Sequence, residues 1–254
     1  MAKSNRRLAA DWLTLMVLAL AATVATDTRA QAPAVDPAAT KILKRMTDYL
    51  GGLKAFSAHT QNTIEDLVAP GTRVDLDVST IVTVERPNKL VTERRGDLVS
   101  QNFYYNGKTL TLYDPTKKVY ATEPAPPTLE GVLSYASDTL GLVIPASDLV
   151  YPNAYDLLMQ DVSAAMVIGK TVVSGVKCDH LLFRRPGVDF QLCVADGKQP
   201  RPVKLVVTDT STPELLSVST VITEFKAAPD VPDARFNFVP PKDAQAIVFM
   251  HLKP

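Results

Sequence analysis

The residues whose types could support chemistry gather between positions 176 and 207. This stretch holds both cysteines of the chain, Cys178 and Cys193, and one of its three histidines, His180. Hydrolysis would need a nucleophile, a base and an orienting group, and the sequence has no Gly-x-Ser-x-Gly and no His-Glu-x-x-His motif. Two cysteines beside one histidine also fall short of the four ligands of a zinc site. We therefore expect no catalytic residue, no metal and no cofactor.

The two cysteines have the spacing of a disulfide across a hairpin. The runs 176–185 and 188–194 resemble strands, and the Arg-Pro-Gly between them indicates a turn. With a loop of four residues, 184–187, Cys178 lies opposite Cys193, where the Cβ atoms are close enough for a disulfide. Closing a loop of roughly 15 residues stabilises a fold by about 3 kcal/mol in the chain-entropy model. The alternative is a pair of buried, reduced cysteines on unrelated strands.

The N-terminus favours the disulfide because it resembles a cleaved secretory signal. A basic region precedes an apolar run over about 12–25, and small residues lead to Ala30. The run is short for a membrane span, and an uncleaved anchor is the alternative. We expect residues 1–30 to be removed and the soluble protein to reach the periplasm of a Gram-negative type envelope, where disulfides form.

Composition indicates one domain and excludes two classes of partner. The 254 residues include 27 basic and 27 acidic side chains, so the chain has no net charge. Nucleic-acid binding and a polybasic membrane patch both need an excess of positive charge. Residues 31–254 suit a single β-rich domain that buries a sizeable core without help from the disulfide.

Periodicity predicts one helix and then an antiparallel sheet. Asp36 followed by proline is a helix start, and apolar residues recur at helical spacing from 42 to 53. Apolar and polar residues then alternate over 74–84, which is typical of a strand with one face in water. Asn106-Gly107 is a strong tight-turn signal between two further strands.

A helical insertion at about 124–163 interrupts the strands. Prolines break the sheet at its start, and Thr128 is placed to cap a helix. The insertion has more apolar residues than one helix stripe requires. It is either a helical layer packed on the sheet or a lid over an apolar cavity.

Four segments together carry a resemblance to a known family. They are Gly-Val-Lys-Cys-Asp-His-Leu-Leu-Phe-Arg at 175–184, Asp-Phe-Gln-Leu-Cys at 189–193, Pro-Val-Lys-Leu-Val-Val at 202–207 and Phe-Asn-Phe-Val-Pro-Pro at 236–241. The chain resembles the predicted periplasmic proteins grouped as domain of unknown function 2092. Two tryptophans of that family's pattern are Phe190 and Cys193 here.

The family is similar in turn to the LolA/LppX-like lipid-binding fold. The resemblance implies an α+β fold in which an open, curved antiparallel half-barrel wraps around a few helices and has an apolar interior. It implies no activity, because the family has no established function.

A concave apolar surface is therefore the best candidate for a site. We expect a non-catalytic protein that binds or carries a lipid acyl chain or another hydrophobic small molecule. The alternative is a structural or interaction protein of the envelope with a protein partner. The residues expected to line the cavity are apolar and come from strands and from the insertion: Leu76, Val78, Val82, Phe103, Leu133, Leu142, Ile144, Leu158, Leu181, Phe183, Phe190, Leu192, Val206 and Val221.

Overall fold

A computed structural model describes residues 34–97, 99–142 and 144–252. The signal predicted at 1–30 lies outside them. Residues Ala32–Pro254 form a compact unit of their own, which is the unit described below.

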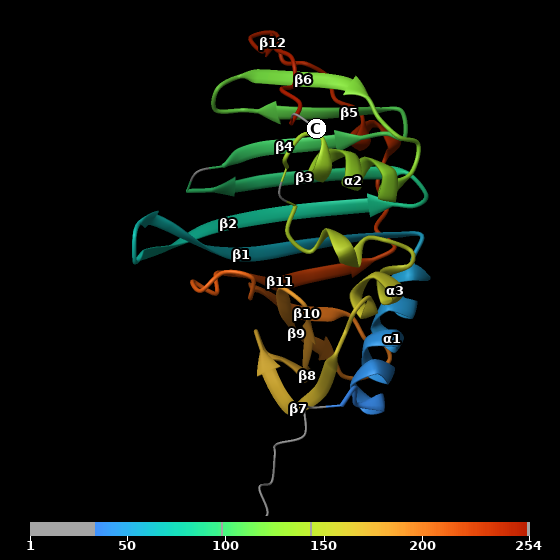
Figure 1. Cartoon of the computed structure of the whole chain (residues 1–254). Coiled ribbons are helices and arrows are strands. Elements are labelled where there is room, and N and C mark those ends of the chain that lie inside the picture. The colour runs from blue at the N-terminus through green and yellow to red at the C-terminus, as the bar shows by residue number, and fades with distance from the viewer. Residues whose placement is uncertain (1–33, 98, 143, 253–254) are drawn as a thin grey trace, which may run out of the picture. The chain divides into compact units, whose positions relative to one another are not determined.

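One sheet accounts for all strands of the described residues, and helices lie on one of its faces (Figure 1). We call this the inner face and the opposite one the outer face. The strands are β1 (Ala55–Ala69), β2 (Thr72–Glu85), β3 (Lys89–Gly96), β4 (Ser100–Tyr105), β5 (Thr109–Asp114), β6 (Val119–Pro124), β7 (Ala164–Val173), β8 (Val176–Arg185), β9 (Val188–Ala195), β10 (Pro202–Asp209), β11 (Ser217–Ala227) and β12 (Gln245–Ala246). The helices are α1 (Pro37–Gly51), α2 (Leu129–Asp138) and α3 (Ala154–Met159), with the 3-10 turns η1 (Ser147–Leu149) and η2 (Asp233–Phe236).

The sheet is open and almost wholly antiparallel. Its order is β12-β6-β5-β4-β3-β2-β1-β11-β10-β9-β8-β7, so the two ends are β12 and β7 and do not meet. The two-residue β12 pairs in parallel with β6, and the other pairs are antiparallel. The long strands β1, β2 and β11 lie at the centre. This arrangement confirms the predicted α+β class with an open, curved sheet.

Local sequence accounts for the start of the chain. Asp36 caps α1 by accepting a hydrogen bond from the amide of Ala38 at 2.8 Å, and Pro37 occupies the first turn. The Asp36 amide donates to the carbonyl of Ala165 on β7, which fixes the helix against that end of the sheet. The predicted helix is confirmed.

The β8–β9 hairpin differs from the predicted register. Arg185 pairs with Val188, so Pro186 and Gly187 alone form the turn, and Gly187 has φ 77°. A tight turn with proline then glycine at its centre suits this conformation, because glycine accepts a positive φ. Cys178 therefore pairs with Ala195 rather than Cys193, and the predicted opposition of the two cysteines is wrong.

Two separate cores hold the helices to the inner face. In the first, α1 packs on β8, β9 and β10 through Leu43 and Met46, which are fully buried with Phe183 and Leu192. In the second, α2 packs on β3, β4 and β5, with Tyr105 and its neighbours buried beneath it. The central strands between these cores are covered mainly by the irregular segment around η1.

The C-terminal segment crosses from one face of the sheet to the other. Phe238 lies among Tyr104, Tyr113 and Tyr120, with ring centroids 5.1–5.3 Å apart, on the outer face of β4–β6. After β12, Phe249 packs into the core of α2 on the inner face. The segment thus covers the free edge of β6.

Candidate functional site

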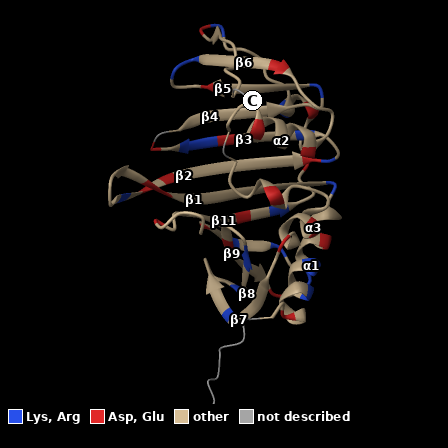
Figure 2. Ribbon diagram, in the orientation of Figure 1, with Lys and Arg blue, Asp and Glu red and all other residues tan. Residues whose placement is uncertain are grey.

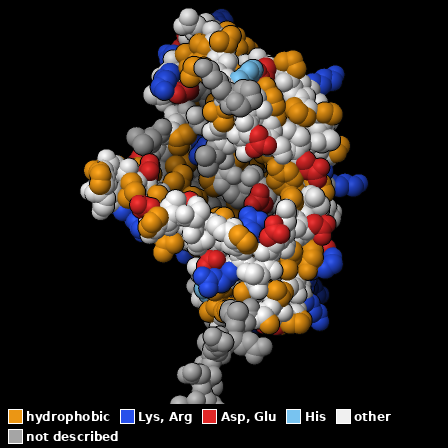
Figure 3. Space-filling model, viewed as in Figure 1, with side chains coloured by type: hydrophobic (Ala, Val, Ile, Leu, Met, Phe, Trp, Pro, Cys, Tyr) orange, Lys and Arg blue, Asp and Glu red, His pale blue; other side chains and the backbone are white. Residues whose placement is uncertain are grey.

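The main pocket lies over the three central strands, between the two cores. Its floor comes from β1, β2, β3 and β11, and its cover comes from α2 and the segment 144–150. In the space-filling view, this face is hollowed beside the helical segment (Figure 3). The pocket is lined by Leu50, Phe56, Ala58, Thr60, Asn62, Thr80, Val82, Leu90, Thr92, Arg94, Leu133, Ile144, Pro145, Ala146, Ser147, Leu149, Val150, Pro202, Thr220, Ile222 and Phe225.

The pocket is a cleft that is partly open to solvent and leaves little room between its walls. The space that a water-sized molecule can occupy in it is about 90 Å³, whereas the free space counted out to open solvent is about 820 Å³. Sites for small molecules enclose roughly 300–1,000 Å³. A ligand therefore has to extend into the open part or displace the cover at 144–150.

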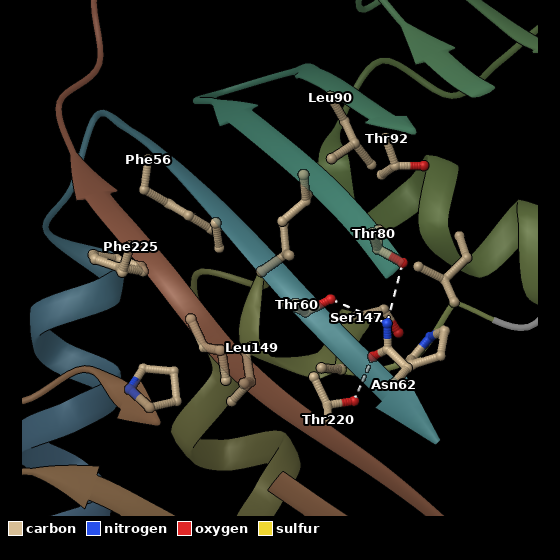
Figure 4. A pocket seen from close by; sticks show the side chains of 18 of the residues that line it. Phe56, Thr60, Asn62, Thr80, Leu90, Thr92, Ser147, Leu149, Thr220 and Phe225 are labelled. Atoms are coloured by element: carbon tan, nitrogen blue, oxygen red, sulfur yellow. Dashed lines mark hydrogen bonds between the residues drawn. The ribbon is translucent and has the colours of Figure 1, made fainter. Parts of the chain in front are cut away.

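One end of the pocket is apolar and aromatic. Phe56 of β1 stacks on Phe225 of β11 with ring centroids 5.8 Å apart, and Leu90 of β3 lies across from them (Figure 4). Leu133 of α2 and Val150 close this end from above. When a ligand covers such a surface and removes it from water, binding is stabilised by roughly 0.8 kcal/mol per buried methylene.

The other end is built around the amide of Asn62, which is only 3% exposed. Its Nδ2 donates to Oγ1 of Thr60 at 3.1 Å, to Oγ1 of Thr80 at 3.1 Å and to the carbonyl of Val78 at 2.9 Å. Its Oδ1 accepts from Oγ1 of Thr220 at 2.8 Å. The amide thus joins β11, β1 and β2 through side chains (Figure 4), and the burial of these polar groups is compensated.

Arg94 brings a positive charge to this polar end. It pairs with Thr80 in the β2–β3 register, and the basic end of β3 is marked in blue in Figure 2. Burial lowers the pKa of its guanidinium, which nevertheless remains charged at physiological pH. The prediction of an apolar lining did not include Arg94, Asn62 or Thr80. A signal for Thr80 existed, because it is the polar member of the otherwise apolar alternation from Val74 to Val84.

The structure brings only part of the predicted lining together. Val82, Leu133 and Ile144 line the main pocket. Leu142 lines an adjoining pocket that shares Leu133 and Ile144 with it. Val78 is buried, and its carbonyl supports Asn62. Leu76 is half-buried beyond the pocket.

The other predicted lining residues fall outside the main pocket. Leu158, Leu181, Phe183, Phe190 and Leu192 belong to the α1 core, where the helix fills the space above them. The remaining three lie elsewhere in the sheet. Phe103 is buried in the α2 core, and Val206 and Val221 pair with Gln191 and Gln61 on the outer face.

The histidines lie outside the main pocket. His180 Nε2 is 3.0 Å from Oε1 of Gln191, and His59 Nε2 is 2.8 Å from Oγ of Ser79, both on the outer face. His251 Nε2 is 3.1 Å from a carboxylate oxygen of Glu123. The described residues include no group of three or more histidine, cysteine or acidic side chains placed to hold a metal ion.

Cys178 and Cys193 are two free, buried thiols in a small apolar cluster with Ala195 and Val203. They are diagonal neighbours on the outer face of β8 and β9, because Cys193 pairs with His180. Burial, and then the neighbouring Cys193, raise the pKa of Cys178 to about 12. Burial also raises the pKa of Cys193. The disulfide stays a prediction.

Comparison of the sequence with family models decides the family. Residues 39–250 match the model of the predicted periplasmic proteins, DUF2092. The chain belongs to this family. The match confirms the expected periplasmic location, and within the described residues no helix is both long and apolar enough to span a bilayer. No curated protein matches this DUF2092 protein significantly.

Several solved structures resemble the DUF2092 chain at low sequence identity. An uncharacterized conserved protein from Thermus thermophilus has 15% identity and a TM-score of 0.49, over 83% of this chain and 99% of that one. LprF from Mycobacterium bovis has 14% identity and a TM-score of 0.48, over 84% and 100%. The lipoprotein LppX from Mycobacterium tuberculosis has 13% identity and a TM-score of 0.43, over 76% and 97%.

Proposed function

We propose that this periplasmic protein binds an apolar, chain-like ligand in the cleft over β1, β2 and β11, without catalysing a reaction. The observation that supports this function is the pocket between the two cores, where Phe56, Leu90 and Phe225 form an apolar end open to a larger cleft. An acyl chain of about a dozen carbons that buried its methylenes there would have ample driving force before the costs of binding.

Full uptake of such a chain is easier if the cover moves, because the space of about 90 Å³ between the pocket walls holds only part of it and the rest would lie in the open part of the cleft. The cover at 144–150 is suited to this. It contains one 3-10 turn of three residues, and Ala146 has φ 61°, a conformation that is unfavourable for a residue other than glycine. Displacing this segment withdraws Leu149 from the first core and Val150 from the second, while the residues that α1 and α2 contribute to these cores keep their contacts with the sheet.

Two measurements test the function. Native mass spectrometry of gently purified protein should show a bound lipid, and N-phenyl-1-naphthylamine, a neutral probe that fluoresces in apolar surroundings, should gain fluorescence on addition. A protein that is consistently free of lipid and does not take up the probe would contradict the proposal.

A matched pair of variants locates the site. Ala58 lines the pocket, whereas its neighbour Ser57 points to the outer face. Ala58→Phe should weaken probe binding about ten-fold or more, since excluding two or three methylenes costs roughly 2 kcal/mol. Ser57→Phe should leave the affinity unchanged, and equal losses in both variants would place the site elsewhere.

A second candidate function is docking of an envelope protein on the edge strand β7. This strand ends the sheet, and Ile168 and Val172 on it are 52% and 60% exposed. Exposed edges with apolar side chains accept an added strand from a partner. Co-purification of an envelope protein that persists with Ala58→Phe and is lost with Val172→Lys would favour this function over ligand binding.

A further inference from the structure

The polarity of the pocket changes in steps along the central strands. The strand register places Phe56, Val84 and Leu90 side by side in one row, and Ala58, Val82 and Thr92 in the next. The following rows add polar groups. One contains Thr60, Thr80 and Arg94 beside Ile222, and the last contains Asn62 and Thr220 beside Val78. The pocket is therefore apolar at the β2–β3 turn and polar toward the β1–β2 turn.

The polar end offers hydrogen-bond donors. Thr60 and Thr80 each accept a hydrogen bond from Asn62, so each hydroxyl keeps its own proton to donate. The guanidinium of Arg94 carries a positive charge and several N–H donors in a planar fork, so it can bind an anion beside another partner. Of the described residues that line the pocket, none is aspartate or glutamate.

This donor-rich, positively charged end selects the charge of the ligand. Charge-assisted hydrogen bonds from a guanidinium to a carboxylate or a phosphate are roughly twice as strong as neutral ones. A cationic head would be repelled by Arg94 and would find no carboxylate among the described lining residues. A neutral ester or alcohol offers weaker acceptors than either anion.

We propose that the ligand is a single-chain amphiphile with an anionic head, whose head lies at Arg94 and Thr80 and whose chain runs toward Phe56 and Leu90. The head is a carboxylate or a phosphate monoester, since both are planar or branched groups of acceptors that fit the guanidinium fork. One chain suits a pocket of this small volume better than several. This inference rests on the proposed function and adds the chemical class of the ligand.

Competition between ligands with the same chain tests the head. Dodecanoate, dodecyl phosphate and dodecanol are titrated, below their aggregation limits at pH 8, against the full-length protein loaded with N-phenyl-1-naphthylamine. We expect the two anions to bind roughly ten- to a hundred-fold more tightly than the alcohol. Equal affinities of the three would overturn the anionic head while leaving apolar binding intact.

Two further arms separate the head from the chain. Acetate and inorganic phosphate at millimolar concentration should not displace the probe, because neither buries a chain. Displacement by either would show a simple anion site and overturn the amphiphile. Failure of the probe and all dodecyl ligands to bind would instead contradict the proposed function itself.

Variants at adjacent arginines assign the head site. Arg94→Gln should lower the affinity for dodecanoate far more than that for dodecanol and so remove most of the preference for dodecanoate, and Arg94→Lys should retain part of that preference. Arg95 is the control, because its guanidinium bonds Asn102 Oδ1 at 2.8 Å on the outer face. A preference that survives Arg94→Gln, or disappears with Arg95→Gln, would overturn the assignment. The head-group comparison in the unmodified protein stands even if a variant fails to fold.

Discussion

The inner face of the sheet is filled over β8–β10 and hollow over β11, β1 and β2. Over β8–β10, α1 lays Leu43 and Met46 directly on Phe183 and Leu192. Over the central strands, no comparable helix stripe is present in the described residues, and the cover is an irregular segment with one 3-10 turn. A regular helix offers an apolar side chain at each turn and packs densely, whereas an irregular segment leaves gaps.

The two regions also differ in what joins their strands. Large aliphatic and aromatic side chains fill the α1 region, and Phe183 stacks on Phe190 with centroids 4.8 Å apart. The central region substitutes hydrogen bonds around Asn62 for part of that packing. A hollow region can thus remain ordered, because buried polar groups that are fully bonded specify a single arrangement.

The largest loss of stability should come from substituting a buried leucine, and the size of the loss should differ between the two regions. Leu192→Ala in the α1 core should lower the free energy of unfolding by about 3–5 kcal/mol, because the dense surroundings cannot collapse. Leu90→Ala, at the pocket wall, should cost about 2 kcal/mol, since one side of Leu90 already faces free space.

Urea denaturation followed by circular dichroism measures both values. Equal losses for the two leucines would mean that the pocket is filled in solution, and would contradict the difference between the filled and the hollow region.

The second largest change in stability should come from the two cysteines, which lie on the outer face of the filled region. We expect Cys178 and Cys193 to be joined in protein exported to the periplasm, and reduction to lower the free energy of unfolding by about 3 kcal/mol. Thiol labelling of the unfolded, unreduced protein should find neither cysteine, and two labelled thiols would contradict the disulfide.

In the reduced protein, both the reactivity of Cys178 and the stability of the fold should depend on pH. A pKa of about 12 for Cys178 leaves about one thiolate in ten thousand at pH 8, so native Cys178 should be alkylated slowly. Because the folded pKa lies above the unfolded value, this thiol stabilises the fold fully below pH 9, and the contribution declines as the pH rises from 9 toward 12. Rapid native alkylation at pH 8 would show that the cluster opens.

The smallest effect should come from the hydrogen bonds of the hollow region. Thr220→Val removes the donor to Asn62 Oδ1 and should cost about 1–2 kcal/mol, because the amide oxygen is left buried and unbonded. Thr208→Val is the control, since its hydroxyl pair with Ser217 at 2.9 Å lies nearer solvent and should cost less. Equal costs would mean that water reaches the Asn62 end.

Local sequence predicted the elements that depend on local chemistry. Asp36 caps α1 as expected, and Asn106-Gly107 forms the turn between β4 and β5, where Gly107 has φ 86° and Asn106 Oδ1 accepts from two following amides. The strand β2 follows the predicted alternation, with Val78 and Val84 buried. Each of these signals acts over a few residues, so no distant contact was needed to find it.

The register of the β8–β9 hairpin could not be found in the same way. A turn of four residues and a turn of two differ by a shift of two positions between strands, which keeps every side chain on its original face. Phe183 and Phe190 point to the inner face in both registers. The apolar pattern therefore could not tell them apart.

The sequence by itself determined the antiparallel strands and the helices, because alternation, caps and turns lie in short runs of residues, and its family motifs identified the periplasmic family. The open, curved form of the sheet was predicted only through the resemblance to that family. Only the tertiary structure decided which apolar residues face a helix and which face free space. Leu192 and Leu90 are equally apolar residues on inner strand faces, yet one is covered by α1 and the other opens on a pocket. That distinction depends on how far the cover fills the space above each strand, which is set by contacts between segments far apart in the chain.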